Sequence, residues 1–260
     1  MKSSHEPSTV ESKETGYLHS METFGTVDGP GIRLVLIIQG CPMRCLYCHN
    51  PDTWTPRKGQ PATVDEILEL YEKNKIYYQN GGITATGGEP LLQLSFLTEL
   101  FEKAKEKGIH TCLDTSGITF SRKQLDKFNE LIKYTDLVML DIKHIDKQEH
   151  IKLTGMASDN VTNFAMYLSE NNIPVWIRHV LVPGITLNDE HLYNLGRFIG
   201  NIKTLKAVDV LPYHDMGKTK YKALGMDYPL EGTPIPTKDD TLHAREIILS
   251  GVRDTLKETV

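Results

Sequence analysis

Residues 33–48 read RLVLIIQGCPMRCLYC, an apolar run that leads directly into three cysteines. The apolar part, Arg33–Gly40, is rich in branched aliphatic residues, as expected of a strand buried on both faces of a parallel sheet. The thiols Cys41, Cys45 and Cys48 follow with a C-x3-C-x2-C spacing. The stretch therefore predicts a buried strand whose carboxyl end carries a group of thiols.

Further apolar runs of the same kind recur along the chain, and helix-patterned segments alternate with them. The predicted strands after Arg33–Gly40 are 82–88, 108–117, 135–143, 173–184 and 206–214. The predicted helices are 63–78, 94–108, 121–134, 160–172, 188–202 and 238–256. Thr63 followed by Glu66 forms a capping-box pattern, and Gly108 suits a helix C-terminus.

Six strands alternating with about six helices predict an α/β fold. We expect a partial (β/α)6 barrel of parallel strands with the helices outside, since six units are too few for a closed eight-stranded barrel. A doubly wound sheet is the alternative. The polar segment 1–15 predicts a mobile leader, and residues 16–260 are expected to form one domain.

The composition limits the functional classes. The 260 residues carry a formal net charge of −5, with 29 Lys and Arg against 34 Asp and Glu, which argues against a general nucleic-acid binder. No apolar run approaches the roughly 20 residues needed to span a bilayer, and no signal-peptide core is visible. We therefore expect a cytoplasmic protein, where grouped cysteines indicate metal binding or catalysis before disulfides.

Three grouped thiols leave several alternatives open. A zinc site could use His49 as a fourth ligand, but structural zinc usually pairs two separated C-x2-C units. Inert thiols would rarely gather this tightly. An iron–sulfur cubane is normally held by four thiolates, so three would leave one iron with an open coordination position. Cys112 is a candidate fourth ligand, although a buried free thiol is the more usual state for such a residue.

Polar motifs follow every predicted strand. In parallel α/β folds, chemistry gathers at the carboxyl ends of the strands, so these motifs predict one shared site across the mouth of the sheet. The motifs after the cysteine loop are GGEP (87–90), DTSG (114–117), DIKH (141–144), RHVLVPG (178–184) and PYHDMGKTKY (212–221).

The cysteine spacing, with the aromatic residue Tyr47 before the last cysteine, resembles the radical S-adenosylmethionine (SAM) superfamily. Together with FGTVDGPGIR (24–33) and the strand-end motifs, it resembles the glycyl-radical-enzyme activating family over nearly the whole chain after Gly16. The resemblance implies a [4Fe-4S] cluster on the three cysteines and SAM on the open iron. Reductive cleavage of SAM would then lead to removal of a glycine α-hydrogen in a partner protein.

The resemblance also implies partners. Most activases of other glycyl radical enzymes carry additional cysteine motifs between the cluster loop and GGE, whereas residues 50–86 contain no cysteine. Pyruvate formate-lyase is therefore the expected partner, with flavodoxin or ferredoxin as electron donor, and we expect a monomer. The alternatives are an activase of another glycyl radical enzyme, a radical SAM enzyme acting on a small molecule, and a non-catalytic iron–sulfur or zinc protein.

Some site residues can be interpreted from their chemistry. Gly87 and Gly88 would let the backbone approach a ligand closely, with Glu89 nearby, although a tight turn that starts a helix explains the same letters. Asp141 and Lys143 share one face of a strand. Lys143 is expected to meet the cofactor carboxylate or ribose, although a charged pair at a strand end can also simply be solvated.

The resemblance supplies the remaining roles. It implies a monovalent cation, Na⁺ or K⁺, on Asp114, Thr115, Met139 and Asp141. It implies adenosine contact for His214, carboxylate contact for Arg178 and a substrate entrance at Asp28. The residues expected to bind the cofactor are Tyr47, His49, Gly87, Gly88, Glu89, Asp141, Ile142, Lys143, Arg178 and His214.

Overall fold

Six parallel strands form the centre of the structure, a computed structural model that describes residues 14–258. Each comes from one of the predicted apolar runs. They are β2 (Arg33–Ile38), β4 (Gly82–Gly87), β5 (His110–Thr115), β6 (Leu137–Asp141), β7 (Val175–Leu181) and β8 (Leu205–Pro212). They pair in chain order within one eight-stranded sheet, β3-β1-β2-β4-β5-β6-β7-β8. Because the parallel strands never reverse their order, the doubly wound alternative is excluded and the open, partial barrel is confirmed.

Two antiparallel strands extend this sheet beyond β2, and the sequence did not predict them. β1 (Thr15–Gly25) pairs with β2 on one side and with β3 (Gln60–Thr63) on the other. β1 is half exposed and rich in polar residues, and β3 is four residues long, so neither reads as a buried strand. Of the predicted leader 1–15, residues 1–13 lie outside the described residues, and β1 begins at Thr15.

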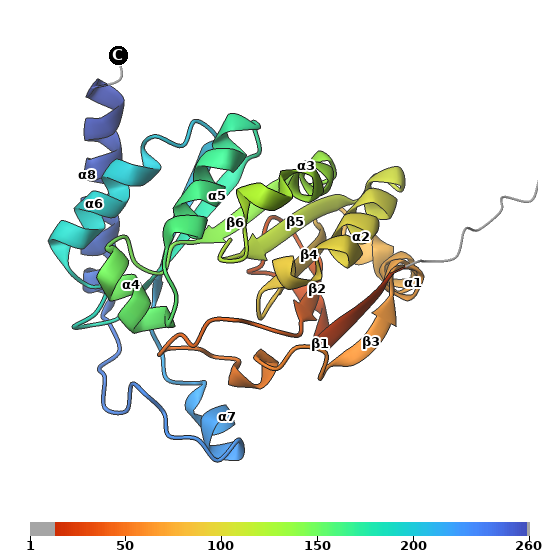
Figure 1. Cartoon of the computed structure of the whole chain (residues 1–260), viewed down its shortest axis with the longest axis horizontal. Helices are drawn as coiled ribbons and strands as arrows, with labels where there is room; N and C mark the ends of the chain where they lie inside the picture. Colours follow the sequence, from red (N-terminus) through yellow and green to blue (C-terminus); the bar gives the residue numbers. More distant parts are fainter. Residues whose placement is uncertain (1–13, 259–260) are drawn as a thin grey trace, which may run out of the picture.

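Helices cover the outer face of the sheet (Figure 1). The six predicted helices are α1 (Val64–Asn74), α2 (Leu94–Glu106), α3 (Leu125–Lys133), α5 (Asp159–Glu170), α6 (Asp189–Ile199) and α8 (Lys238–Glu258). The short helices α4 (Lys147–Thr154) and α7 (Lys218–Ala223) were not predicted. Single 3-10 turns also occur: η1 (Pro51–Thr53), η2 (Lys75–Tyr77), η3 (Pro90–Gln93) and η4 (Arg122–Gln124). None of the helices within residues 14–258 is long and apolar enough to cross a membrane.

The predicted helix ends are confirmed in atomic detail. The Thr63 backbone N–H donates to the Glu66 carboxylate at 2.7 Å, and the Glu66 N–H donates back to the Thr63 hydroxyl at 3.3 Å. This reciprocal pair satisfies two donors that the first turn of α1 would otherwise leave free. After α2, Gly108 adopts a left-handed φ of 69°, as predicted for a helix C-terminus.

Apolar packing divides into two layers. The large core lies between the sheet and the helices. A separate cluster of Cys112, Leu137 and Met139, with the partly buried Trp176 against it, is formed by β5, β6 and β7. Since side chains alternate along a strand, Cys112 and Met139 share a sheet face with Asp114 and Asp141, two residues further along each strand. This inner face of the barrel leads to the candidate site.

Helices α6 and α8 pack closely at two glycines. A Cβ atom on Gly196 would lie 2.1 Å from the Ile248 carbonyl oxygen, and one on Gly251 would lie 2.4 Å from the Tyr193 carbonyl oxygen. The backbones of α6 and α8 are therefore in direct contact at these two glycines.

We predict that Gly196→Ala destabilises the protein by about 1–3 kcal/mol, because the added methyl group must push two helix backbones apart. At about 2–4 °C per kcal/mol for a domain of this size, the thermal midpoint should fall by several degrees in a calorimetric scan. The control is Glu246→Ala on the exposed face of α8, which should leave the midpoint nearly unchanged. Equal midpoints for Gly196→Ala and wild type would contradict the close helix contact.

Candidate active site

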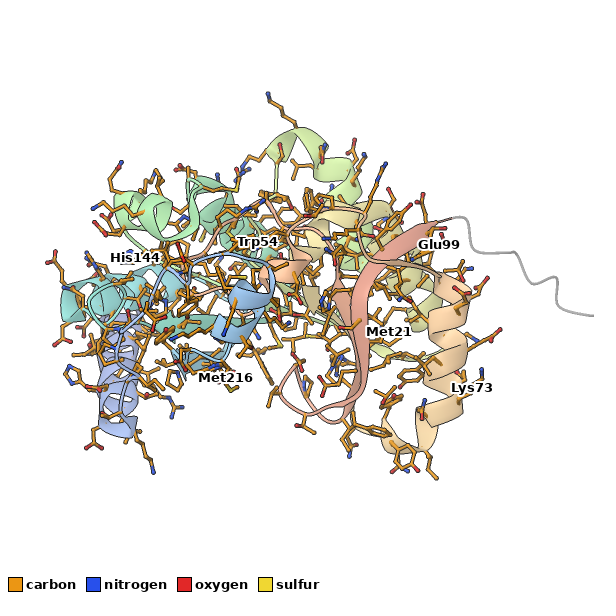
Figure 2. The ribbon with its side chains drawn as sticks, turned by 90° about the horizontal axis from the view of Figure 1, so that it is seen from below. Met21, Trp54, Lys73, Glu99, His144 and Met216 are labelled. Carbon is orange, nitrogen blue, oxygen red and sulfur yellow. The ribbon has the colours of Figure 1, made fainter. Side chains whose placement is uncertain are left out.

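A cavity of about 510 Å³ lies at the mouth of the barrel, and most of the predicted site residues line it. Those residues are Asp28, Cys41, Cys45, Tyr47, Cys48, His49, Gly87, Gly88, Asp114, Thr115, Asp141, Lys143, Arg178 and His214. Apart from Asp28, which precedes β2, and Arg178, which lies in the middle of β7, they lie at or just after the carboxyl ends of the parallel strands. Figure 2 shows Trp54, another lining residue, between the β1 side of the molecule, labelled at Met21, and the α7 side, labelled at Met216.

Backbone hydrogen bonds fix the cysteine loop on both sides. On one side, the Cys41 N–H donates to the Trp54 carbonyl at 3.1 Å. On the other, the Arg44 N–H donates to Thr154 at 2.8 Å and the Leu46 N–H donates to Leu153 at 3.0 Å. The unpredicted helix α4 therefore supports the loop with the carbonyl groups of its last turn.

The three thiols are free and lie along the cavity wall. Burial raises the pKa of Cys41 to about 12 and that of Cys45 to about 11, so both are neutral unless a metal displaces their protons. Across residues 14–258, no three His, Cys, Asp or Glu side chains converge closely enough to hold a single metal ion.

His49 is engaged elsewhere. Its ring stacks on His214 with 3.9 Å between the ring centroids, and its Nε2 lies 3.0 Å from the His214 carbonyl oxygen. A Cβ on Gly217 would lie 3.0 Å from the Cys48 carbonyl oxygen. The segment that follows β8 therefore packs directly on the cysteine loop, and it explains His49 without a role as a zinc ligand.

Close backbone packing explains why Gly87 and Gly88, at the end of β4, carry no side chain. A Cβ on Gly88 would lie 2.2 Å from the Gly40 carbonyl oxygen and 3.3 Å from Cys41 Cβ. Gly87 has a left-handed φ of 116°, and a Cβ there would lie 2.5 Å from the Ile38 nitrogen. Both residues line the cavity, so the close approach brings the end of β4 against the cysteine loop.

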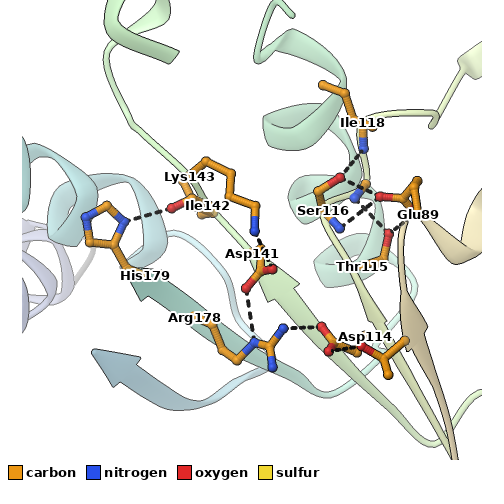
Figure 3. Close-up of polar contacts among 12 residues, drawn as sticks. Glu89, Asp114, Thr115, Ser116, Ile118, Asp141, Ile142, Lys143, Arg178 and His179 are labelled. Atoms are coloured by element: carbon orange, nitrogen blue, oxygen red, sulfur yellow. Dashed lines mark hydrogen bonds and ion pairs between the residues drawn. The ribbon is translucent and has the colours of Figure 1, made fainter. Parts of the chain in front are cut away.

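Glu89 turns away from the cavity and is fully buried. Its carboxylate accepts hydrogen bonds from the hydroxyl groups of Thr115 and Ser116 and, at 3.1 Å, from the Leu91 N–H (Figure 3). Burial outweighs these hydrogen bonds and raises the pKa of Glu89. The residue thus caps η3 and joins the ends of β4 and β5, which matches the turn-and-helix interpretation of GGEP.

A row of alternating charges crosses the cavity floor (Figure 3). The Lys143 ammonium donates to Asp141 at 2.7 Å, and Arg178 Nε donates to the other Asp141 oxygen at 3.0 Å. The Arg178 guanidinium also donates to Asp114, whose second oxygen accepts from the Thr86 hydroxyl at 2.6 Å. Lys143 lies 5.7 Å from the centre of the Tyr47 ring, within cation–π range.

The two carboxylates of this row differ electrostatically. Burial acts to raise the pKa of Asp141, but Arg178 and Lys143 outweigh it and lower the pKa to about 2. At Asp114, burial raises the pKa in spite of Arg178, and the nearby negative charge of Asp141 adds to the increase. One guanidinium shared by two carboxylates therefore leaves Asp114 the less compensated of the two.

Two further predicted residues are not among those that line the cavity. The Ile142 side chain is buried in the main core, and its carbonyl accepts a 2.7 Å hydrogen bond from His179 Nδ1. Met139 belongs to the inner apolar cluster together with Cys112, which is also absent from the lining. Cys112 is therefore a buried free thiol away from the other three.

Several lining residues were not predicted. Thr86 orients Asp114, and its inward position follows from the alternation of GITATGG, so the signal was present in the sequence. The others come from loops and strand ends without a chemical signature. They are Met43, Asn50, Thr53, Trp54, Ser116, Val180, Leu211 and Pro212.

Comparisons with known proteins show which family the chain belongs to. The model of the Radical SAM superfamily matches residues 35–196. The pyruvate formate-lyase-activating enzyme of Staphylococcus aureus strain USA300 is 50% identical over 226 residues, which cover 85% of this chain and 90% of that protein.

Solved structures share the fold at lower identity. A domain of the pyruvate-formate lyase-activating enzyme from Bacteroides vulgatus has a TM-score of 0.54 at 22% identity, covering 66% of this chain and 94% of that one. QueE from Escherichia coli has a TM-score of 0.52 at 17% identity, covering 82% and 92%. Streptococcus suis SuiB, bound to the precursor peptide SuiA, has a TM-score of 0.64 at 17% identity, covering 91% and 48%.

We predict that Gly88→Ala lowers the iron bound per chain several-fold after anaerobic reconstitution, because its methyl group would displace the backbone beside Cys41. The control is Gly108→Ala, after α2, where a Cβ meets nothing within 4 Å and the left-handed φ of 69° costs about 1 kcal/mol. That variant should retain its iron. If Gly88→Ala also bound a full complement of iron, the close approach would not matter for the thiols.

Proposed function

Because the chain belongs to the radical SAM superfamily, and within it to the pyruvate formate-lyase-activating enzymes, we propose that it activates pyruvate formate-lyase. The reaction is reductive cleavage of SAM coupled to removal of an α-hydrogen from a glycine of the partner. The observation that carries this proposal is that three free thiols share one cavity with a row of buried and partly buried charged side chains.

Cys41, Cys45 and Cys48 would hold a [4Fe-4S] cluster, and their three-thiol set leaves one iron for SAM. When bound, the cluster supplies the electron that cleaves the sulfonium of SAM. The protein binds the rest of SAM. In this proposal, backbone groups of Gly87 and Gly88 meet the SAM ammonium. Lys143 and Arg178, which are partly buried, are the cations available for its carboxylate or ribose.

Two buried polar atoms support a nucleoside contact. The Tyr47 hydroxyl and His214 Nδ1 are buried without a hydrogen-bond partner in the described part of the chain, and both residues line the cavity. Such atoms are costly unless a ligand or water satisfies them. We assign His214 to the adenosine, with Tyr47 and His49 forming the adjoining wall.

A monovalent cation, Na⁺ or K⁺, would bind between Asp114 and Asp141, the two carboxylates bridged by Arg178. Asp114 is the less compensated carboxylate, so added positive charge would favour its ionised form. Hard oxygen ligands suit such an ion. Its binding would release Arg178 to meet the SAM carboxylate.

Asp28 is proposed to receive the glycine segment of the partner. It lines the cavity and is only partly buried, and no hydrogen bond to its carboxylate is found within residues 14–258. A free carboxylate can accept a backbone N–H of an extended peptide.

We further propose that flavodoxin or ferredoxin supplies the electron, and that the reaction takes place in the cytoplasm, where these thiols stay reduced.

We predict a glycyl radical signal by electron paramagnetic resonance when reduced, iron-loaded protein is mixed with SAM and inactive pyruvate formate-lyase. Replacing Cys41, Cys45 or Cys48 by Ala should abolish both the signal and methionine release. The matched control is Cys112→Ala, which removes a thiol outside the cavity and should retain most activity. Radical formation only on a different glycyl radical enzyme would keep the chemistry and overturn the partner. Methionine release with no glycyl radical on any such protein would refute the proposed function.

We also predict that K⁺ or Na⁺, compared with choline at equal ionic strength, tightens SAM binding by about tenfold, or about 1.4 kcal/mol. Calorimetric titration of the iron-loaded protein measures this change. Asp114→Asn removes a negative charge from the proposed ion site, so the variant should bind SAM with the same affinity in all three salts. A wild-type affinity independent of the cation would rule out the ion site.

A further inference from the structure

Arg33, the first residue of β2, is a fully buried arginine, with 0% of its surface exposed. Within residues 14–258, no carboxylate lies within ion-pair distance of its guanidinium. A buried cation without a carboxylate is costly and persists only when its donors are satisfied in other ways. Arg33 is absent from the residues that line the cavity, so contact with the cofactor does not explain it.

The guanidinium instead joins three segments of the chain, one of which is His110 at the start of β5, whose carbonyl accepts from Nη2 at 3.3 Å and whose Nδ1 lies 3.2 Å from the same nitrogen. Its Nη1 donates to the Pro30 carbonyl at 2.9 Å, and its Nη2 donates to the Ile83 carbonyl at 2.8 Å. Its Nε donates to the Thr84 hydroxyl at 2.5 Å, and that hydroxyl donates onward to the Asp28 carbonyl at 2.6 Å. Directly and through Thr84, Arg33 therefore holds the backbone on both sides of Gly29.

Residues 26–31 include the anchored Asp28 and Pro30, and their backbone passes close to Arg33 and Asn80. Gly29 and Gly31 have left-handed φ values of 119° and 72°. A Cβ on Gly31 would lie 2.1 Å from the Asn80 carbonyl oxygen, and one on Gly29 would lie 3.2 Å from the Arg33 side chain. Asp28 stands at one of the anchored positions, and its carboxylate faces the cavity.

We propose that Arg33 is a positioning residue that fixes residues 26–31 so that Asp28 presents its carboxylate to the incoming glycine segment. The proposal rests on the proposed function and deepens it. Arg33 acts through the backbone of its neighbours and does not touch the reacting atoms. Arg33 anchors Asp28 and none of the groups proposed to bind SAM, so loss of the Arg33 anchor is expected to affect the peptide substrate more than the cofactor.

The fork of donors is specific to arginine. A lysine at this position would offer one ammonium group on a flexible stem and could not reach Pro30, Ile83 and Thr84 with the same geometry. Arg33→Lys should therefore resemble Arg33→Gln more closely than wild type. A role based on positive charge alone would instead be rescued by the lysine substitution.

The first test measures hydrogen–deuterium exchange of the iron-loaded protein. Arg33→Gln and the milder Thr84→Val should each speed exchange of the backbone amides in 26–31 by at least tenfold, with little change in the amides of β6 and β7. Exchange in 26–31 equal to wild type in both variants would overturn the proposal. Because this readout needs neither SAM nor partner, it stands even if the proposed function fails.

The second test measures glycyl radical formed per methionine released, with a peptide containing the target glycine. Arg33→Gln should lower this ratio at least tenfold and raise the KM for the peptide, while iron content and methionine release change less than threefold. Asp28→Asn should give the same pattern, and the double variant no larger loss than either single variant. Arg245→Gln, at an exposed position on α8, is the matched control and should match wild type.

Three experimental outcomes would each contradict a different part of the proposal. Parallel losses of iron, methionine release and radical yield in both Arg33→Gln and Thr84→Val would mean that Arg33 only stabilises the fold. Multiplicative losses in the Arg33→Gln and Asp28→Asn double variant would mean that Arg33 does not act through Asp28. A wild-type protein that releases methionine but forms no radical would refute the proposed function and leave the exchange result to decide the anchoring role of Arg33.

Discussion

The guanidinium of Arg178 lies between the buried carboxylate of Asp114 and the partly buried carboxylate of Asp141, and this arrangement constrains the inner face of the barrel. Its partners come from neighbouring strands, with Asp141 directly opposite Arg178 in the register and Asp114 one strand further away. Removing one member of a buried ion pair costs about 3–5 kcal/mol, because the charge left behind is uncompensated. A one-residue slip of any of these strands would turn its charged side chain into the apolar core, so the charges and the register specify each other.

The sequence was informative for structural features that depend mainly on residues close together along the chain. Buried parallel strands are largely apolar, so the parallel strands could be predicted from their apolar runs, and even the edge strand β8, which has no buried residue, contains such a run. The Thr63–Glu66 capping box needs only residues within one turn. The site could be predicted because parallel strands deliver their carboxyl ends to one edge, which brings Cys41, Asp141 and His214 together although they are distant along the chain.

The sequence was less informative for structural features that depend on contacts between distant parts of the chain. β1 is a half-exposed strand held by β2, and α4 is a short helix whose last carbonyl groups hold the cysteine loop. Neither has a strong pattern of its own. Glu89 likewise reads as a ligand beside two glycines, and only the positions of Thr115 and Ser116 in space show that its carboxylate points away from the cavity. Which way a side chain turns at a strand end depends on partners that the sequence does not reveal.

The cysteine loop depends on a segment made much later in synthesis. His49 contacts His214 across 165 positions of the chain, and the Lys220 ammonium donates to Asn50 at 2.8 Å across 170. A ribosome must therefore translate most of the chain before the loop can acquire its last neighbours. Until then one side of the thiol site is open to water. Iron delivered to the nascent chain would therefore meet an incomplete, solvent-exposed site.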